Sequence, residues 1–322
     1  MARLTIDEKI ERLETLTPGV NSEEAHAELK SALKAKHNRL VAKAAKICGE
    51  HYLSDFIAEL QSAFRYFADK QDKDKACFAK KAIIKALYEM DYRDDEFYAT
   101  AISVRQHEPV WGGHVDTAVD VRCWSALGLT LSANSRVVFP LLEMLHDEEP
   151  QARLGAVKAI ACLNISVAEV LLREKILDGD EDSYVVGECF QQLMRIEPDE
   201  SLSFLARYLA AENEEIMEYA ALAISQWNDI NALECLQDAF DNAVSAYEKR
   251  KLLEAIALHR SDTAKQYLLD LLQDAPRLVA LAIVKALSIY KNNESLKQKV
   301  NHIVCNHAVS ELQSEYTEYW LS

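Results

Sequence analysis

A small residue followed by an aliphatic residue recurs along this chain at intervals of about 32 residues. The pairs are Ala86-Leu87, Ala126-Leu127, Ala159-Ile160, a degenerate Gln191-Gln192, Ala223-Ile224, Ala255-Ile256 and Ala286-Leu287. The steps between their first members are 40, 33, 32, 32, 32 and 31 residues. A fixed period of this size indicates stacked supersecondary units, none of which can bury its apolar face alone. The sequence therefore predicts a repeat array.

Each period contains two predicted helices joined by a short polar turn. Aliphatic residues between 137 and 145 are followed by an acidic joint over 146–150 and an alanine-rich stretch from 152 to 163. Apolar residues three and four apart give each helix one wide apolar face. Pro150 and Pro276 are expected to open second helices, and Pro198 a first helix, because the first helical position needs no N–H donor. Only 8 Gly and 6 Pro occur among 322 residues, which leaves little turn chemistry for a β-sheet.

The pattern resembles HEAT repeats, most closely where Glu149-Pro150-Gln151-Ala152-Arg153 precedes Ala156, Ala159 and Ile160. We therefore predict an all-α fold, a HEAT-type α–α superhelix (solenoid) of eight or nine helical pairs that starts near Ser22. The expected organisation is an N-terminal cap over residues 1–21, the HEAT-repeat array over 22–292, and a C-terminal capping helix and tail over 293–322. Trp320, Tyr316 and Tyr319 are expected to seal the last apolar stripe.

Charge is distributed unevenly along the chain. Residues 1–90 carry 16 Lys and Arg against 14 Asp and Glu, whereas residues 91–322 carry 20 against 38. The acidic excess of the second stretch disfavours nucleic acid, which needs clustered cations. It favours a protein or peptide partner with a basic segment.

The cysteines and the N-terminus bear on the cellular compartment. The seven cysteines are Cys48, Cys77, Cys123, Cys162, Cys189, Cys235 and Cys305. Their odd number and wide spacing argue against a disulfide framework, so we expect mostly buried thiols in a reducing compartment. The first residues lack the apolar core of a signal peptide, and no apolar run approaches membrane-spanning length. We expect a cytoplasmic protein without membrane contact.

One segment interrupts the period. The 40-residue step falls on residues 105–116, which join the two helices of the third unit and contain a Pro, a Trp and a Gly pair. Because loops carry function more often than helices, this segment is the candidate partner-binding site. Its predicted contact residues are His107, Glu108, Trp111, Gly112, Gly113, His114 and Asp116. The alternative is that Trp111 folds back and plugs a gap between helical layers while the glycines make the turn.

The same segment carries a second resemblance. Residues 41–60, 75–87, 108–116 and 186–190 together resemble an uncharacterised bacterial family of HEAT-repeat proteins, over about residues 38–292. The stretch Glu108-Pro109-Val110-Trp111-Gly112-Gly113 is the most specific part of this likeness. The family has no established activity, so the resemblance implies the fold and leaves the function open. His114 departs from the small residue expected at its position.

No catalytic motif or metal-binding spacing emerges from the sequence. His107 and His114, with Glu108 and Asp116, match no zinc spacing, and neither do His302, Cys305 and His307. The acidic run from Asp178 to Asp182 lacks the later Gly and Glu of a calcium loop. We therefore predict no catalytic residue, no metal and no cofactor.

Three functions are compatible with these features. The first is a non-catalytic protein-binding scaffold that uses the concave groove of the second helices, the 105–116 loop, or both. The second is an enzyme or chaperone related to bilin lyases, some of which have HEAT-like repeats. It requires a tetrapyrrole pocket and an exposed nucleophilic cysteine. The third is a HEAT-fold DNA glycosylase, which the acidic balance disfavours.

Overall fold

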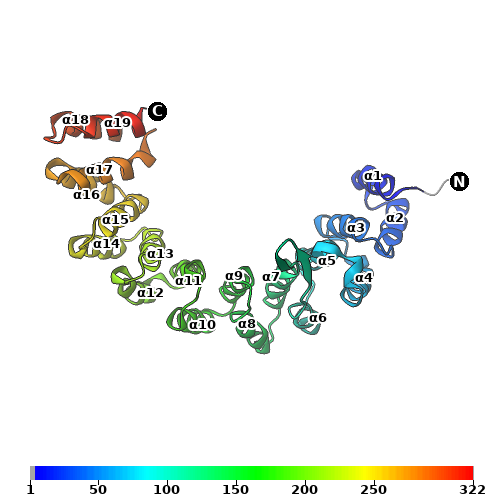
Figure 1. The fold of residues 1–322 in the computed structure, drawn as a ribbon. Helices are drawn as coiled ribbons and strands as arrows, with labels where there is room; N and C mark the ends of the chain where they lie inside the picture. Colours follow the sequence, from blue (N-terminus) through cyan, green and yellow to red (C-terminus); the bar gives the residue numbers. More distant parts are fainter. Residues whose placement is uncertain (1–3, 322) are drawn as a thin grey trace. The chain divides into compact units, whose positions relative to one another are not determined.

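The computed structural model describes residues 4–321, and these fold into α-helices with one β-hairpin. The chain divides into two compact units, residues 1–171 and 172–322. Helices α2 to α19 follow one another as nine first-and-second-helix pairs, with α1 ahead of them (Figure 1). This confirms an all-α, HEAT-type solenoid pattern of eight or nine pairs.

The first unit contains helices α1 to α9, and α10 runs from it into the second unit. Its elements are α1 (Ile6–Leu16), α2 (Glu23–Leu33), α3 (Asn38–Glu50), α4 (Ile57–Asp69), α5 (Phe78–Glu89), α6 (Asp95–Ala101), β1 (His107–Val110), β2 (Gly113–Asp116), α7 (Val119–Leu129), α8 (Val138–Met144), α9 (Pro150–Ile160) and α10 (Ile165–Asp178). Short 3₁₀ turns occur at Thr17–Gly19, Ser54–Phe56, Gln71–Lys73, Lys75–Cys77 and Ser135–Val137.

The second unit continues the same alternation. Its helices are α11 (Ser183–Ile196), α12 (Pro198–Ala206), α13 (Glu214–Ser225), α14 (Ile230–Asn242), α15 (Ala246–Leu258), α16 (Asp262–Asp274), α17 (Arg277–Leu287), α18 (Glu294–Asn306) and α19 (Leu312–Trp320), with 3₁₀ turns at Arg207–Ala210 and Ser288–Tyr290. Pro150 and Pro198 occupy the first helical turn as predicted, whereas Pro276 is the N-cap residue of α17.

Within each unit the helices form two layers (Figure 1). In the first unit, α3, α5, α7 and α9 pack side by side in sequence order, and α2 packs on α4. The recurring small residue of each second helix lies inside this contact: Ala86, Ala126 and Ala159 are almost fully buried. A Cβ atom on Gly49 would lie 2.8 Å from the Cα atom of Ala86, so α3 and α5 can approach this closely only with glycine at position 49. Close packing between second helices therefore explains the 32-residue sequence period.

The C-terminal segment differs in part from its prediction. Residues 293–322, expected to form one capping helix and a tail, contain two helices, α18 and α19. Asn293 caps α18, and Leu312, Tyr316 and Trp320 bury one face of α19 at four-residue spacing. The Nε1 atom of Trp320 donates to the Val284 carbonyl at 2.9 Å. Trp320 and Tyr316 therefore seal the last stripe as predicted, whereas Tyr319 is half-buried.

The cysteines are free, and their burial is mixed. Cys48, Cys77 and Cys189 are buried, Cys123 and Cys235 are half-buried, and Cys162 and Cys305 are exposed. The expectation of mostly buried thiols is therefore wrong for the last two: Cys162 follows the end of α9, and Cys305 lies in the last turn of α18. Within residues 4–321, no helix combines the length and apolarity needed to cross a bilayer.

Candidate functional site

The 105–116 segment forms a two-stranded antiparallel hairpin between α6 and α7 (Figure 1). Val110 pairs with Gly113, so only Trp111 and Gly112 form the turn. Gly112 has φ of +89°, which is typical of the third residue of a type II turn and favours glycine. Gly113 does not have positive φ, so its backbone does not require glycine.

Trp111 lies at the tip of this hairpin and is fully exposed, at 103% relative accessibility. The hypothesis that Trp111 plugs a gap between helical layers is therefore wrong. The reason is geometric: a two-residue turn places its side chains beyond the ends of both strands and away from the helices. Val110 and Val115 are also exposed, at 51% and 44%. The hairpin thus presents apolar side chains to solvent at its tip and along one face.

The two faces of the hairpin differ in composition. Alternation along the paired strands places Glu108, Val110 and Val115 on one face. The other face carries His107, Pro109, His114 and Asp116. His107 and His114 are both exposed. Among the residues that the structure describes, no group of three or more His, Cys, Asp or Glu side chains could hold a metal ion.

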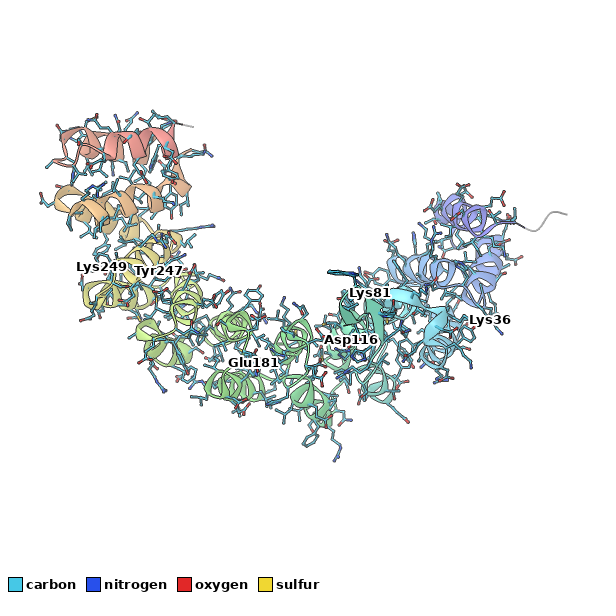
Figure 2. The ribbon with its side chains drawn as sticks, in the orientation of Figure 1. Lys36, Lys81, Asp116, Glu181, Tyr247 and Lys249 are labelled. Carbon is cyan, nitrogen blue, oxygen red and sulfur yellow. The ribbon has the colours of Figure 1, made fainter. Side chains whose placement is uncertain are left out.

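Asp116 holds the base of the hairpin instead of facing solvent. Its side chain is buried, accepts hydrogen bonds from the backbone N–H groups of Gln106 at 3.0 Å and Ala118 at 2.9 Å, and pairs with Arg122 at 2.5 Å. Burial alone would raise the pKa of Asp116, but these donors offset it and hold the pKa below its usual value. Its predicted role as a contact residue is corrected accordingly: Asp116, which is labelled in Figure 2, is buried and supports the hairpin.

Glu108 ties the hairpin to the start of α5. It accepts hydrogen bonds from the Ala76 backbone N–H at 2.6 Å, the Gln106 side-chain amide at 2.6 Å and the Thr117 hydroxyl at 3.1 Å. Burial opposes ionisation, yet these donors and nearby Lys75 keep the pKa of Glu108 below its ordinary range. Glu108 therefore fixes the hairpin as an ionised acceptor, and it offers less to a partner than the sequence suggested.

A network of buried charges continues below the hairpin. Arg122, which is buried, donates to the Asp147 carboxylate at 3.0 Å as well as to Asp116. Arg105 also donates to Asp147, at 2.6 Å, and Arg153 donates to the Asp147 carbonyl at 2.8 Å. Removing one member of such a network leaves an uncompensated buried charge. The hairpin base is therefore strongly held while its tip is free.

A second arm of the network reaches α5. Lys80 and Asp74 are both fully buried and pair at 3.1 Å, and Lys80 also donates to Gln106 at 2.7 Å. Gln106 in turn donates to the Asp74 carbonyl at 2.8 Å. This network was not predicted from the sequence, although its signal is visible in three successive helical pairs as an Asp followed six residues later by Lys or Arg. The pairs are Asp74 with Lys80, Asp116 with Arg122, and Asp147 with Arg153.

The second unit carries a different feature, an open pocket of about 670 Å³ beside α12, α14 and the start of α15. Its walls include several alanines and the carboxylates of Glu234 and Asp238, which form no ion pair within residues 4–321. Val244 at its rim is 92% exposed. Glu248, also in the lining, accepts hydrogen bonds from the backbone N–H groups of Val244 and Ser245. The pocket is therefore acidic and lined by small side chains.

Comparison with known proteins gives no family assignment. No family model matches the chain, and no curated protein sequence matches it. The helical-repeat fold implied by the resemblance to an uncharacterised bacterial family is observed. Membership of that family, with its EPVWGG loop, stays a prediction.

Solved structures give only distant similarities. Kap121p bound to Pho4p aligns over 98% of this chain and 39% of that chain, at 14% identity and a TM-score of 0.49. Human deoxyhypusine hydroxylase in complex with glycerol aligns over 80% of this chain and 91% of that chain, at 17% identity and a TM-score of 0.31. The complex of CpcE and CpcF of phycocyanin lyase from Nostoc sp. PCC7120 aligns over 94% and 96%, at 12% identity and a TM-score of 0.33. This chain spans about two-fifths of the Kap121p chain, and the activities of these proteins do not transfer to it.

Proposed function

We propose that this chain is a non-catalytic scaffold that binds a protein or peptide through the tip of the hairpin. The observation that carries the proposal is the fully exposed Trp111 at the end of a hairpin whose base is held by buried ion pairs. Tryptophan is enriched among the residues that dominate protein interfaces, because it buries a large rigid surface. A rigid support lowers the entropic cost of presenting such a side chain. Val110 and Val115 on one face of the hairpin and His114 on the other would flank it in the contact, with His107 nearer the base.

The partner's charge is part of this proposal. The second unit carries 14 Lys and Arg against 26 Asp and Glu, a difference of −12 over residues 172–322. Its pocket supports a partner with a basic segment, because Glu234 and Asp238 have no ion pair among the described residues 4–321 and a Lys or Arg side chain could pair with either carboxylate. The same field disfavours nucleic acid at this unit.

A bilin-lyase-like activity is not favoured by the geometry. The two exposed cysteines, Cys162 and Cys305, are not in the lining of the described pockets. The half-buried Cys235 does lie in the acidic pocket, but burial and nearby Asp238 raise the pKa of its thiol. A raised pKa opposes thiolate formation and hence nucleophilic reactivity.

The test is Trp111→Ala, with Phe139→Ala as its matched control. Phe139 is an exposed aromatic residue in the same unit, on α8. Trp111→Ala should unfold within about 0.5 kcal/mol of the wild type, because Trp111 buries no surface, and Phe139→Ala within about 1 kcal/mol, because Phe139 is 54% exposed. Affinity capture from the native host should lose its specific partner with Trp111→Ala and keep it with Phe139→Ala. Retention of the partner by folded Trp111→Ala would refute the hairpin as the contact site.

A further inference from the structure

A groove of about 460 Å³ opens on the first unit between α3 and α5, with α1 at its edge. Its apolar lining consists of Ile10, Ala42, Phe78 and Ala82. Phe78 is 57% exposed although it belongs to α5, which packs against α3 and α7. A large exposed aromatic side chain in a groove marks a surface that another molecule could cover.

Cations dominate the polar lining of this groove. They are Arg39, Lys43, Lys46, Lys81 and Lys85, against the two carboxylates of Glu50 and Glu89. The helical spacing produces this cluster: positions 39, 43 and 46 share one face of α3, and 78, 81 and 85 share one face of α5. Lys81 is labelled in Figure 2, in the same part of the unit as Asp116. The summed charge of residues 1–90 hides this local basic surface.

Three of the five cations, Lys46, Lys81 and Lys85, are paired only at the solvent-facing surface, and Lys85 also lies 5.4 Å from the centroid of the Trp124 ring. Lys46 lies 3.6 Å from Glu50 and Lys85 lies 3.6 Å from Glu89, both as exposed pairs one helical turn apart. Lys81 pairs with Asp120 at the start of α7, also in the open. Exposed ion pairs contribute little net stability, because water and salt compete for both partners. An incoming carboxylate can therefore replace these counter-ions at small cost.

Helix α1 shows which kind of ligand the groove accepts. Its Asp7 pairs with Arg39 at 3.1 Å and its Glu14 pairs with Lys43 at 2.5 Å. Ile10, between these two acids in sequence, lines the groove. Positions 7, 10 and 14 lie on one side of a helix, so α1 already applies an acid–apolar–acid helical face to this surface. The remainder of the groove, lined by α3 and α5, has the same chemistry and is open.

We propose that this groove binds an acidic, amphipathic helical segment of a partner protein. The proposal rests on the scaffold function. It adds a contact for an acidic segment, whereas the pocket of the second unit favours a basic segment. The apolar lining fits aliphatic side chains of such a helix, and the two rows of cations fit its flanking carboxylates. A phosphate backbone fits less well, because Glu50 and Glu89 also line the groove and the chain as a whole carries a net charge of −16.

The test uses the full chain and a fluorescent 16-residue peptide with Leu at helical positions i, i+3, i+4 and i+7 and Glu at the flanking positions. A matched peptide carries Lys in place of every Glu. Fluorescence anisotropy should give at least tenfold tighter binding of the acidic peptide, with affinity that falls as salt rises. Equal or tighter binding of the lysine peptide would overturn the proposal. Equally tight competition by a deoxythymidine oligonucleotide of the same charge would also overturn it, since the groove would then bind any polyanion.

Variants assign the binding to the groove. Lys46→Gln/Lys85→Gln and, separately, Phe78→Ser should each weaken acidic-peptide binding at least tenfold. Lys34→Gln/Lys70→Gln is the control, because it removes the same charge at the C-terminal ends of α2 and α4, outside the groove lining. All replaced side chains are exposed, and unchanged circular dichroism melting checks the fold. Unchanged affinity in the groove variants, or an equal loss in the control, would refute the assignment.

The two proposals fail separately in these experiments. Trp111→Ala should leave peptide affinity unchanged, because Trp111 does not line the groove. Peptide binding with native-partner capture retained by Trp111→Ala would remove the hairpin contact and leave the groove proposal standing. Loss of partner capture by Trp111→Ala, together with no binding of the acidic peptide by the wild type, would support the hairpin contact and refute the groove proposal.

Discussion

The two units of this chain share one architecture and present different surfaces. Residues 1–171 carry 22 Lys and Arg against 26 Asp and Glu, and residues 172–322 carry 14 against 26. The first unit places five cations in the groove between α3 and α5 and adds an exposed hairpin. The second unit has a pocket with two carboxylates, Glu234 and Asp238, that form no ion pair in the described part of the chain. The buried alanine and aliphatic positions are fixed by stacking, and the solvent-facing positions are not. Two units of one fold can therefore differ in partner chemistry without any change in packing.

The units also differ in how charge is buried. In the first unit Lys80 and Arg122 are fully buried cations in one connected network. In the second unit, as far as residues 172–321 are described, the buried Lys175 pairs with Asp180 at 3.0 Å beside the start of α11. Buried ion pairs cost much when broken, because the remaining charge has no compensation. The first unit should therefore be the more sensitive to loss of a cation.

Arg122→Met should give the largest effect of any single change considered. It leaves the buried Asp116 and Asp147 without their shared guanidinium, and we expect a loss of about 3–5 kcal/mol in the free energy of unfolding. Urea denaturation followed by circular dichroism measures the loss. Arg136→Met is the control, since Arg136 is exposed and lies over the Phe139 ring.

Thiol labelling locates that effect within the chain. Cys77 is buried in the first unit and Cys189 in the second. Arg122→Met should accelerate native-state labelling of Cys77 and leave Cys189 protected. Equal acceleration at both thiols would contradict a difference between the units, because it would mean that the two units unfold together.

Glycine substitutions give a smaller effect and compare turns in the two units. Gly112 in the hairpin and Gly179 after α10 both have positive φ, +89° and +81°, with open space around them. Ala at either position should cost about 1 kcal/mol, because an L-residue is strained there. Gly113→Ala should change the free energy of unfolding by less than about 0.5 kcal/mol, since Gly113 is open and not at positive φ. Thermal unfolding compares the three variants, and an equal cost at Gly113 would contradict the turn geometry.

Much of the fold could be predicted from the sequence, because stacking of second helices imposes a period on small and aliphatic residues. For the candidate site, the sequence predicted the location at residues 105–116 but neither the hairpin nor the roles of its residues. The strands around Trp111 are four residues long with weak apolar alternation, so nothing distinguished a hairpin from an irregular loop. Glu108 is held by the Ala76 N–H, 32 residues away in sequence, and no local pattern predicts that contact. The six-residue spacing of Asp116 and Arg122 is visible in the sequence, but spacing alone does not distinguish a buried ion pair from an exposed one. The net charge of residues 1–90 did not reveal the basic groove, because its cations come from two helices about 40 residues apart in sequence.

Site-specific photo-crosslinking tests the scaffold proposal most directly. The chain carries benzoylphenylalanine in place of Trp111, or in place of Phe139 as the exposed control, and is irradiated in its native host. We predict a discrete crosslinked protein from position 111 that position 139 does not give, because only the hairpin tip is proposed to contact the partner. The absence of any adduct from position 111, or the same adducts from both positions, would contradict the account.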